Sequence, residues 1–158
     1  MAGLEGLPWK DYLTMTAAMV GAVLGILNMW NTINQRRVRL RVTPKHTISL
    51  PDGGRGFAIE VINLSAFPVT VDEVGFEIAG RGVAKRARAV VAYPDLPDRK
   101  PWPRRLEPRE EVSAHLNVAH LAVHRGKKIG RAYATTVCDV TRYGNSPALD
   151  QLRDELRR

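Results

Sequence analysis

The stretch GAVLGILNMWNTINQRRVRLRV, residues 21–42, changes character near its middle. The 24 residues from Tyr12 to Gln35 carry no charge, and four arginines then follow within six positions. From Val38 onward apolar residues alternate with arginines, which is the period of a strand with one buried face. The sequence therefore predicts an apolar helix over residues 12–35 that leads directly into a β-rich domain.

The segment LTMTAAMVGAVLGILNMW, residues 13–30, has no polar face on a helical wheel. A helix that is apolar all round must be buried all round, in lipid or in protein, and crossing a bilayer core takes about 20 residues. Trp9, Tyr12 and Trp30 lie at its two ends, as interfacial aromatic residues do. The strongest apolar side chains contribute about −2 to −4 kcal/mol to insertion. We expect a transmembrane helix in a lipid bilayer, preceded by a short tail over residues 1–11.

Two other interpretations of this helix stay open. It could be buried among partner subunits of a virion or a secretion complex. It could also be the core helix of a soluble β-sandwich protein that binds nucleic acid. A cleaved signal peptide is disfavoured, because residues 1–9 contain no lysine or arginine and Asp11 abuts the apolar run.

The charges that flank the apolar segment predict its orientation. Lys10 precedes the segment, whereas five basic residues follow it: Arg36, Arg37, Arg39, Arg41 and Lys45. Basic flanking residues stay on the cytoplasmic side of a membrane. We therefore expect a single-pass protein of the cell inner membrane with a cytoplasmic C-terminal domain. Arg36 and Arg37 would then lie against anionic lipid headgroups, where each basic residue contributes about 1 kcal/mol.

Small residues recur every four positions on one side of the apolar segment. Ala17, Gly21 and Gly25 form this stripe, and the two glycines make one GxxxG motif. Small residues let two helices approach closely in a membrane. The stripe predicts a helix-packing face and a possible homo-oligomer.

Residues 36–145 show the period of two that is typical of strands. The first strand begins at Val38 and is expected to end at Pro44, and a further short run covers residues 47–50. Other expected strands are 57–63, 69–78, 83–93, 112–118 and 129–140. The alternation of apolar residues shifts by one position between Val71 and Val74, which predicts a bulge at Asp72-Glu73. Six or seven short strands separated by turns predict a mainly β fold, a sandwich of about 110 residues.

Two stretches resemble immunoglobulin-like sandwich modules. They are VINLSAFPVTVDEVGFEI, residues 61–78, and RRLEPREEVSAHL, residues 104–116. Each pairs a turn with an alternating strand, and the resemblance implies an immunoglobulin-like β-sandwich. The cysteine pair and core tryptophan of antibody domains are absent, because Cys138 stands alone and Trp102 lies in a proline-rich loop. The Asn63-Leu64-Ser65 triplet reads as a turn with Asn63 as the turn former rather than as a glycosylation site.

The last segment, residues 146–158, has the pattern of a short amphipathic helix. Ser146 can cap it, Pro147 suits its first turn, and Leu149, Leu152 and Leu156 share one face. We expect this helix to pack on an edge of the sandwich, and the alternative is a docking helix for a partner.

The positive charge of the chain belongs to the domain. The net charge of the chain is +8. Residues 1–35 have a net charge of −1, so residues 36–158 have a net charge of +9. One basic cluster comprises Arg81, Lys85, Arg86 and Arg88. A second lies in a loop over residues 94–108 and beyond, where five basic residues surround Trp102: Arg99, Lys100, Arg104, Arg105 and Arg109. We expect these five to be exposed with Trp102 as an anionic-binding surface for lipid or a partner, and nucleic acid is an unlikely partner.

No motif for an enzyme or a cofactor is present in the sequence. It lacks a P-loop, a dinucleotide-binding glycine pattern, a G-x-S-x-G motif and a CxxC motif. His115, His120 and His124 are close in sequence but have no third metal ligand nearby. Cys138 is expected to be a buried structural thiol. We expect neither metal nor cofactor, and a non-enzymatic interaction or structural module with an unknown protein partner.

Overall fold

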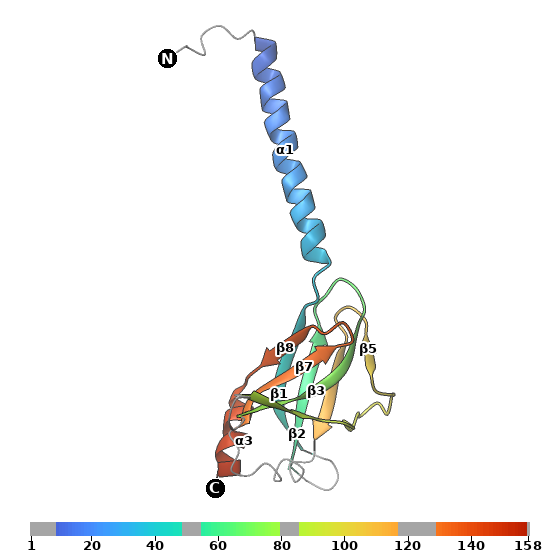
Figure 1. The fold of residues 1–158 in the computed structure, drawn as a ribbon. Coiled ribbons are helices and arrows are strands. Elements are labelled where there is room, and N and C mark those ends of the chain that lie inside the picture. The colour runs from blue at the N-terminus through green and yellow to red at the C-terminus, as the bar shows by residue number, and fades with distance from the viewer. Residues whose placement is uncertain (1–8, 49–54, 80–85, 117–128, 158) are drawn as a thin grey trace. The chain divides into compact units, whose positions relative to one another are not determined.

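The structure is a computed structural model that describes residues 9–48, 55–79, 86–116 and 129–157. Its elements are α1 (Trp9–Gln35), β1 (Leu40–Ile48), β2 (Arg55–Asn63), β3 (Val69–Ala79), β4 (Arg86–Val90), β5 (Arg104–Leu106), β6 (Glu111–Leu116), β7 (Ile129–Thr136), β8 (Thr141–Gly144) and α3 (Pro147–Arg157) (Figure 1). The chain divides into two compact units, Met1–Arg37 and Val38–Arg158. The predicted mainly β fold with an apolar N-terminal helix and a short C-terminal helix is confirmed.

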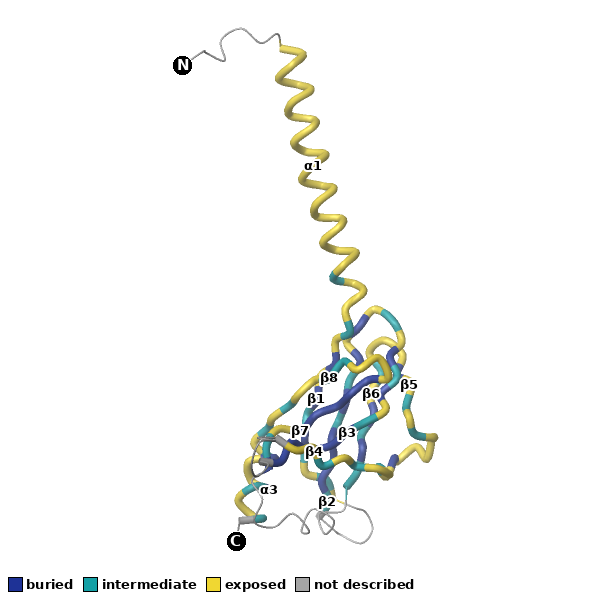
Figure 2. The backbone as a smooth tube through the Cα atoms, in the orientation of Figure 1, coloured by how far each residue is buried: buried dark blue, intermediate teal, exposed yellow. Residues whose placement is uncertain are grey.

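The strands form two antiparallel sheets. The first has the order β1-β2-β6, and the second has the order β4-β3-β7-β8 with β5 also paired to β3. Phe57 of the first sheet and Phe76 of the second meet with ring centroids 6.0 Å apart. Buried side chains from both sheets belong to one hydrophobic core. Figure 2 marks the buried residues of both sheets in dark blue.

Strands β2 and β3 follow the predicted alternation. Phe57, Ile59 and Val61 are fully buried along β2, and β3 buries Val69, Val71, Val74, Phe76 and Ile78. The pairing of β3 with β7 shifts between Val71 and Glu73, so the predicted bulge is confirmed. The extra residue, Asp72, is exposed, and it lets Val71 and Val74 both face the core.

The prediction that Pro44 ends the first strand is wrong. Pro44 lies in the middle of β1, opposite Ile59 of β2. A proline is tolerated there because β1 is the edge strand of its sheet. On its outer side no neighbouring strand requires a backbone N–H donor. The carbonyl of Pro44 accepts a hydrogen bond from the Ser146 hydroxyl at 2.5 Å, so the start of α3 covers this part of the edge.

The expected single strand over residues 129–140 is in fact two strands. β7 ends at Thr136, the chain turns through Asp139 with φ 59°, and β8 returns beside β7. A buried Cys138 is also wrong, because this turn exposes its thiol. β8 brings Gly144 against β1, where a Cβ would lie 1.8 Å from the carbonyl oxygen of Val42. Only glycine fits this junction between the two sheets.

The proline-rich segment after β4 contains a strand that the sequence pattern did not predict. Residues 104–106 form β5, and Leu106 is fully buried opposite Val69. The expected strand over residues 83–93 ends earlier in the structure, since β4 stops at Val90, and residues 83–85 lie outside the described residues. The turn expected at residues 51–54, the end of the run at Leu50 and the possible turn over residues 118–124 lie outside the described residues.

The C-terminal helix packs on the domain as predicted. The Ser146 hydroxyl accepts a hydrogen bond from the Leu149 N–H at 3.3 Å, and Leu149 and Leu152 are buried in the core. Arg153 donates to the carbonyls of Ile129 at 3.0 Å and Gly130 at 2.6 Å, and it forms an ion pair with Asp150. These contacts join α3 to the start of β7.

Candidate interaction surfaces

Helix α1 presents apolar side chains on every side. Its 27 residues include none that is buried (Figure 2). Trp9, Leu24 and Trp30 each expose 60% or more of their surface. The segment is long and apolar enough to span a membrane. The described hydrophobic core consists of domain residues alone, and whether α1 is buried in lipid or in protein stays open.

The few polar side chains of α1 are satisfied within the helix. The hydroxyls of Thr14, Thr16 and Thr32 donate to carbonyls four residues earlier, at 2.9, 2.7 and 2.9 Å. Such bonds remove the need for water around these hydroxyls, which suits a helix in an apolar medium. A Cβ added to Gly21 or Gly25 would have no neighbour within 4 Å. The stripe with Ala17 is thus open in the isolated chain, and its role in helix packing stays a prediction.

Two residues, Arg36 and Arg37, separate the end of α1 at Gln35 from Val38, the first residue of the second unit. The N–H groups of Arg36 and Arg37 donate to the carbonyls of Ile33 and Asn34, so the last helical turn reaches Arg37. The domain holds the very next residue, because Arg142 donates to the Val38 carbonyl at 3.1 Å. Arg36, Arg37, Arg39 and Arg41 are all exposed.

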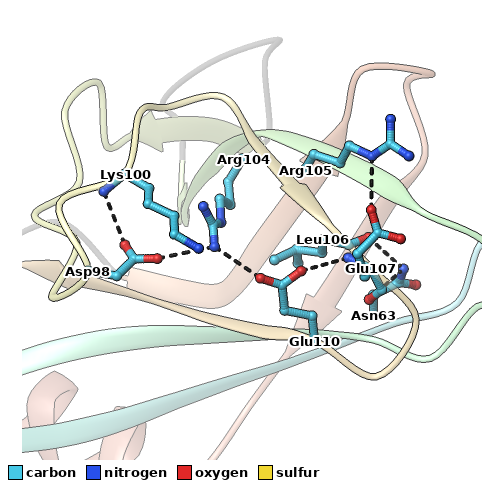
Figure 3. Close-up of polar contacts among 8 residues, drawn as sticks. All are labelled: Asn63, Asp98, Lys100, Arg104, Arg105, Leu106, Glu107 and Glu110. Carbon is cyan, nitrogen blue, oxygen red and sulfur yellow. Dashed lines mark hydrogen bonds and ion pairs between the residues drawn. The ribbon is translucent and has the colours of Figure 1, made fainter.

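The expectation that five basic residues of the loop are exposed is wrong for Arg104. Its side chain is only 11% exposed and pairs with Asp98 at 3.1 Å and Glu110 at 3.0 Å (Figure 3). The cause is β5, whose pairing with β3 brings the guanidinium between two carboxylates. Arg104 is therefore a clamp that ties residues 98 and 110 together.

The other residues of the loop fall into two groups. Arg105 pairs with Glu107 at 3.1 Å, whereas Arg99, Lys100 and Arg109 are exposed and form no ion pair with a described residue. Trp102 is partly buried against the core, and its Nε1–H donates to the Asp72 carbonyl at 2.8 Å. The expectation of a tryptophan held off the sandwich in water is wrong, because the bulge at Asp72 offers it an acceptor.

Asn63 organises the turns beside this clamp. It is fully buried, and its Nδ2 donates to the carbonyls of Phe67 at 2.9 Å, Leu106 at 3.0 Å and Glu107 at 3.3 Å. Its Oδ1 accepts from the Ser65 N–H at 2.9 Å, which makes the predicted turn. One side chain thus joins the turn after β2 to the turn after β5 (Figure 3).

The second sheet carries an aromatic and ionic cluster on its outer face that the sequence reading missed. Tyr133 lies over Gly75, has the Arg88 guanidinium 5.0 Å from its ring centroid, and donates to Glu73. Burial and this hydrogen bond raise the pKa of Tyr133. A hydrogen bond with Tyr143 raises the pKa of Arg88.

Arg131 completes this cluster. It pairs with Glu77 at 3.2 Å and lies 4.4 Å from the Tyr143 ring centroid. The alternation of residues along β7 could have indicated this cluster. Arg131, Tyr133 and Thr135 lie on the face opposite the small residues of the strand. The charges of the cluster balance one another, so it stabilises the sheet rather than attracting a charged ligand.

The remaining predicted residues are not brought together. His115 lies in β6 and pairs with Asp95 through its backbone, while His120 and His124 lie outside the described residues. Of the first basic cluster, Arg81 and Lys85 also lie outside them, and Arg88 belongs to the outer-face cluster. Comparisons with protein-family models, curated proteins and solved structures give no match.

Proposed function

We propose that the chain is a single-pass protein of the cell inner membrane whose cytoplasmic domain serves as a non-enzymatic interaction or structural module. One observation carries this proposal. Helix α1 is apolar on all sides and buries none of its 27 residues, while the domain that follows has its own closed core. A helix that is apolar on all sides requires an apolar surrounding, which a lipid bilayer supplies.

The strand order supports an immunoglobulin-like sandwich for the domain. If the strands are lettered in chain order with β4 as C′ and β5 as D, the sheets read A-B-E and C′-C-F-G. Immunoglobulin-like sandwiches also divide strands A, B and E from C, F and G. The departure is β5, which pairs with β3 of the second sheet. The fold alone names neither an activity nor a partner.

The cytoplasmic orientation and the partners follow from charge. The basic residues after the helix outnumber those before it by five to one, which favours a cytoplasmic domain. We propose that the exposed Arg99 and Lys100 contact an acidic partner protein. The stripe with Gly21 and Gly25 would pair two copies of the helix, and a Gly21→Ile, Gly25→Ile variant that pairs as well as wild type in a membrane two-hybrid assay would reject that contact.

Nucleic acid is not the partner that we propose. Arg104 and Arg105 are neutralised by carboxylates, and the Trp102 ring packs against the core. The loop keeps the exposed cations Arg99, Lys100 and Arg109 but lacks the free aromatic side chain on which single-stranded bases stack. The assembly alternative, with α1 buried among partner subunits of a virion or secretion complex, is tested with the experiment below.

Expression of the full chain in a bacterium that lacks its natural partners separates lipid from protein as the surrounding of α1. We expect the protein to sediment with membranes, to resist alkaline carbonate and to be released by a nonionic detergent, because lipid alone satisfies the helix. A peripheral control protein should leave the same membranes in carbonate. Release of the chain by carbonate, or its aggregation without membranes, would contradict the proposal and favour the assembly alternative.

A further inference from the structure

One end of the domain combines exposed apolar side chains with cations. This proximal end comprises the turns at residues 64–68, 107–110 and 137–140 together with Val38 (Figure 1). Hydrogen bonds hold them near the start of β1: Leu64 N–H donates to the Arg39 carbonyl at 2.8 Å, and Arg109 N–H donates to the Asn63 carbonyl at 2.7 Å. The Val137 N–H donates to Thr70 near the start of β3 at 3.0 Å, which places the third turn at the same end.

The apolar part of the proximal end consists of side chains at turn tips. Leu64 is 45% exposed and Val137 is 63% exposed. Arg109 and Arg142 are exposed beside them, and Arg36, Arg37 and Arg39 precede the first strand. Four carboxylates lie at this end, and Glu107 and Glu110 are paired with Arg105 and Arg104. Glu111 and Asp139 remain, so the five other cations stand against two anions. A surface with apolar tips and excess positive charge is complementary to an anionic headgroup layer.

The length of chain between α1 and the domain limits where this end can be. The apolar run ends at Trp30, and the helical rise of about 1.5 Å per residue carries Arg37 about 10 Å further. The headgroup layer outside a hydrocarbon core is about 5–8 Å thick. Val38, which the domain already holds through Arg142, therefore leaves the membrane at the outer edge of the headgroups.

We propose that the proximal end of the domain rests on the anionic headgroup layer of the bilayer. Leu64 and Val137 make the apolar contacts, and Arg109 and Arg142 bind lipid phosphate. The inference rests on the proposed membrane function and adds to it a second, peripheral lipid-binding site on the folded domain. That site fixes how far the domain stands from the membrane and leaves the flank with Arg99 and Lys100 free for a partner.

The single native thiol gives a direct test. Cys138 lies next to Val137 in the proximal turn, whereas Ile48, which is 71% exposed, ends β1 at the other end of the strand. At about 3.3 Å per residue, the strand from Leu40 to Ile48 separates its two ends by about 26 Å. The full chain is reconstituted in nanodiscs of phosphatidylcholine, alone or mixed equally with phosphatidylglycerol. A fluorophore is attached to Cys138, or to position 48 in an Ile48→Cys, Cys138→Ser variant.

A spin-labelled headgroup lipid then serves as the quencher. We expect it to remove most of the emission from the label on Cys138, more in anionic than in zwitterionic nanodiscs, and to leave the label at position 48 unchanged. Arg109→Gln should weaken the quenching in anionic nanodiscs. Arg99→Gln is the matched control, because Arg99 is also an exposed arginine with positive φ, 51° against 67° for Arg109, and it should have no effect.

The outcomes separate this inference from the function on which it rests. A chain that does not co-purify with nanodiscs would overturn the membrane function and the inference together. A chain that is inserted but shows equal, weak quenching at both positions would overturn only the headgroup contact. Equal quenching of Cys138 in both lipid compositions, unaffected by Arg109→Gln, would overturn the role of the cations.

Discussion

Replacing Asn63 by aspartate is expected to lower the melting temperature of the domain by roughly 10–25 °C. The side chain is fully buried, and its Nδ2 donates to three carbonyl oxygens. An aspartate has the same shape, but its carboxylate donates nothing and would face those oxygens with a negative charge. Losing the donors and burying an uncompensated charge costs about 3–5 kcal/mol.

The measurement is thermal unfolding of the full chain in mild detergent, followed by near-UV circular dichroism. Asn145→Asp is the control, because Asn145 is exposed and undergoes the same chemical change. The deficit of Asn63→Asp should shrink as the pH falls toward about 4, because burial against carbonyl oxygens raises the pKa of this carboxyl above its ordinary value and the protonated form regains one donor. Equal melting temperatures for the two variants would show that the Asn63 clamp does not hold the turns together.

Replacing Val23 by arginine is expected to remove most of the protein from the membrane. Val23 lies near the middle of the apolar run, where an arginine costs about 2.5–3.5 kcal/mol. The native segment gains only about 2–4 kcal/mol on insertion, so the substitution brings insertion close to zero or makes it unfavourable. Arginine is a good helix former, and a loss of membrane binding would therefore not reflect a loss of helix.

Thr32→Arg is the matched control for Val23→Arg. Position 32 lies beyond Trp30, where a long cationic side chain reaches the interface and stays hydrated. We expect the carbonate-resistant fraction to fall at least about tenfold for Val23→Arg, since 1.4 kcal/mol is a factor of ten, and to stay unchanged for Thr32→Arg. Equal membrane retention of both variants would mean that the helix does not cross the hydrocarbon core.

The sequence predicted the elements whose pattern is long and local. Residues 12–35 lack charge throughout, and the apolar positions of β2 and β3 alternate over several residues, so helix and strands were foreseeable. The bulge at Asp72 could also be predicted, because Val71 and Val74 are three residues apart and cannot face the same side of a regular strand. The cap of α3 was visible for the same reason, since Ser146, Pro147 and the leucines are neighbours in the chain.

The missed features depend on pairings that are distant in sequence. β5 is three residues long and stands among prolines, and only its pairing with β3 makes it a strand. Arg104 looks like its exposed neighbours in the sequence, yet that pairing places it between Asp98 and Glu110. Cys138 sits in a run that reads as one strand, and only the return of β8 along β7 reveals a turn there.

The clamp residues hold the turns that form the proximal end of the domain. Asn63 and Arg104 fix the turns that carry Leu64 and Arg109, while Arg142 fixes Val38 directly after the helix. Loosening the turns with Asn63→Asp should therefore also weaken the quenching of a label on Cys138.

The most direct test of the membrane-anchored, cytoplasmic domain uses the exposed thiol of Cys138. Spheroplasts that express the full chain are treated with a membrane-impermeant maleimide, before and after permeabilisation. We predict that Cys138 reacts only after permeabilisation, whereas a thiol introduced as Ala2→Cys in a Cys138→Ser background reacts in intact spheroplasts. Modification of Cys138 in intact spheroplasts, with the thiol at position 2 protected, would contradict the account.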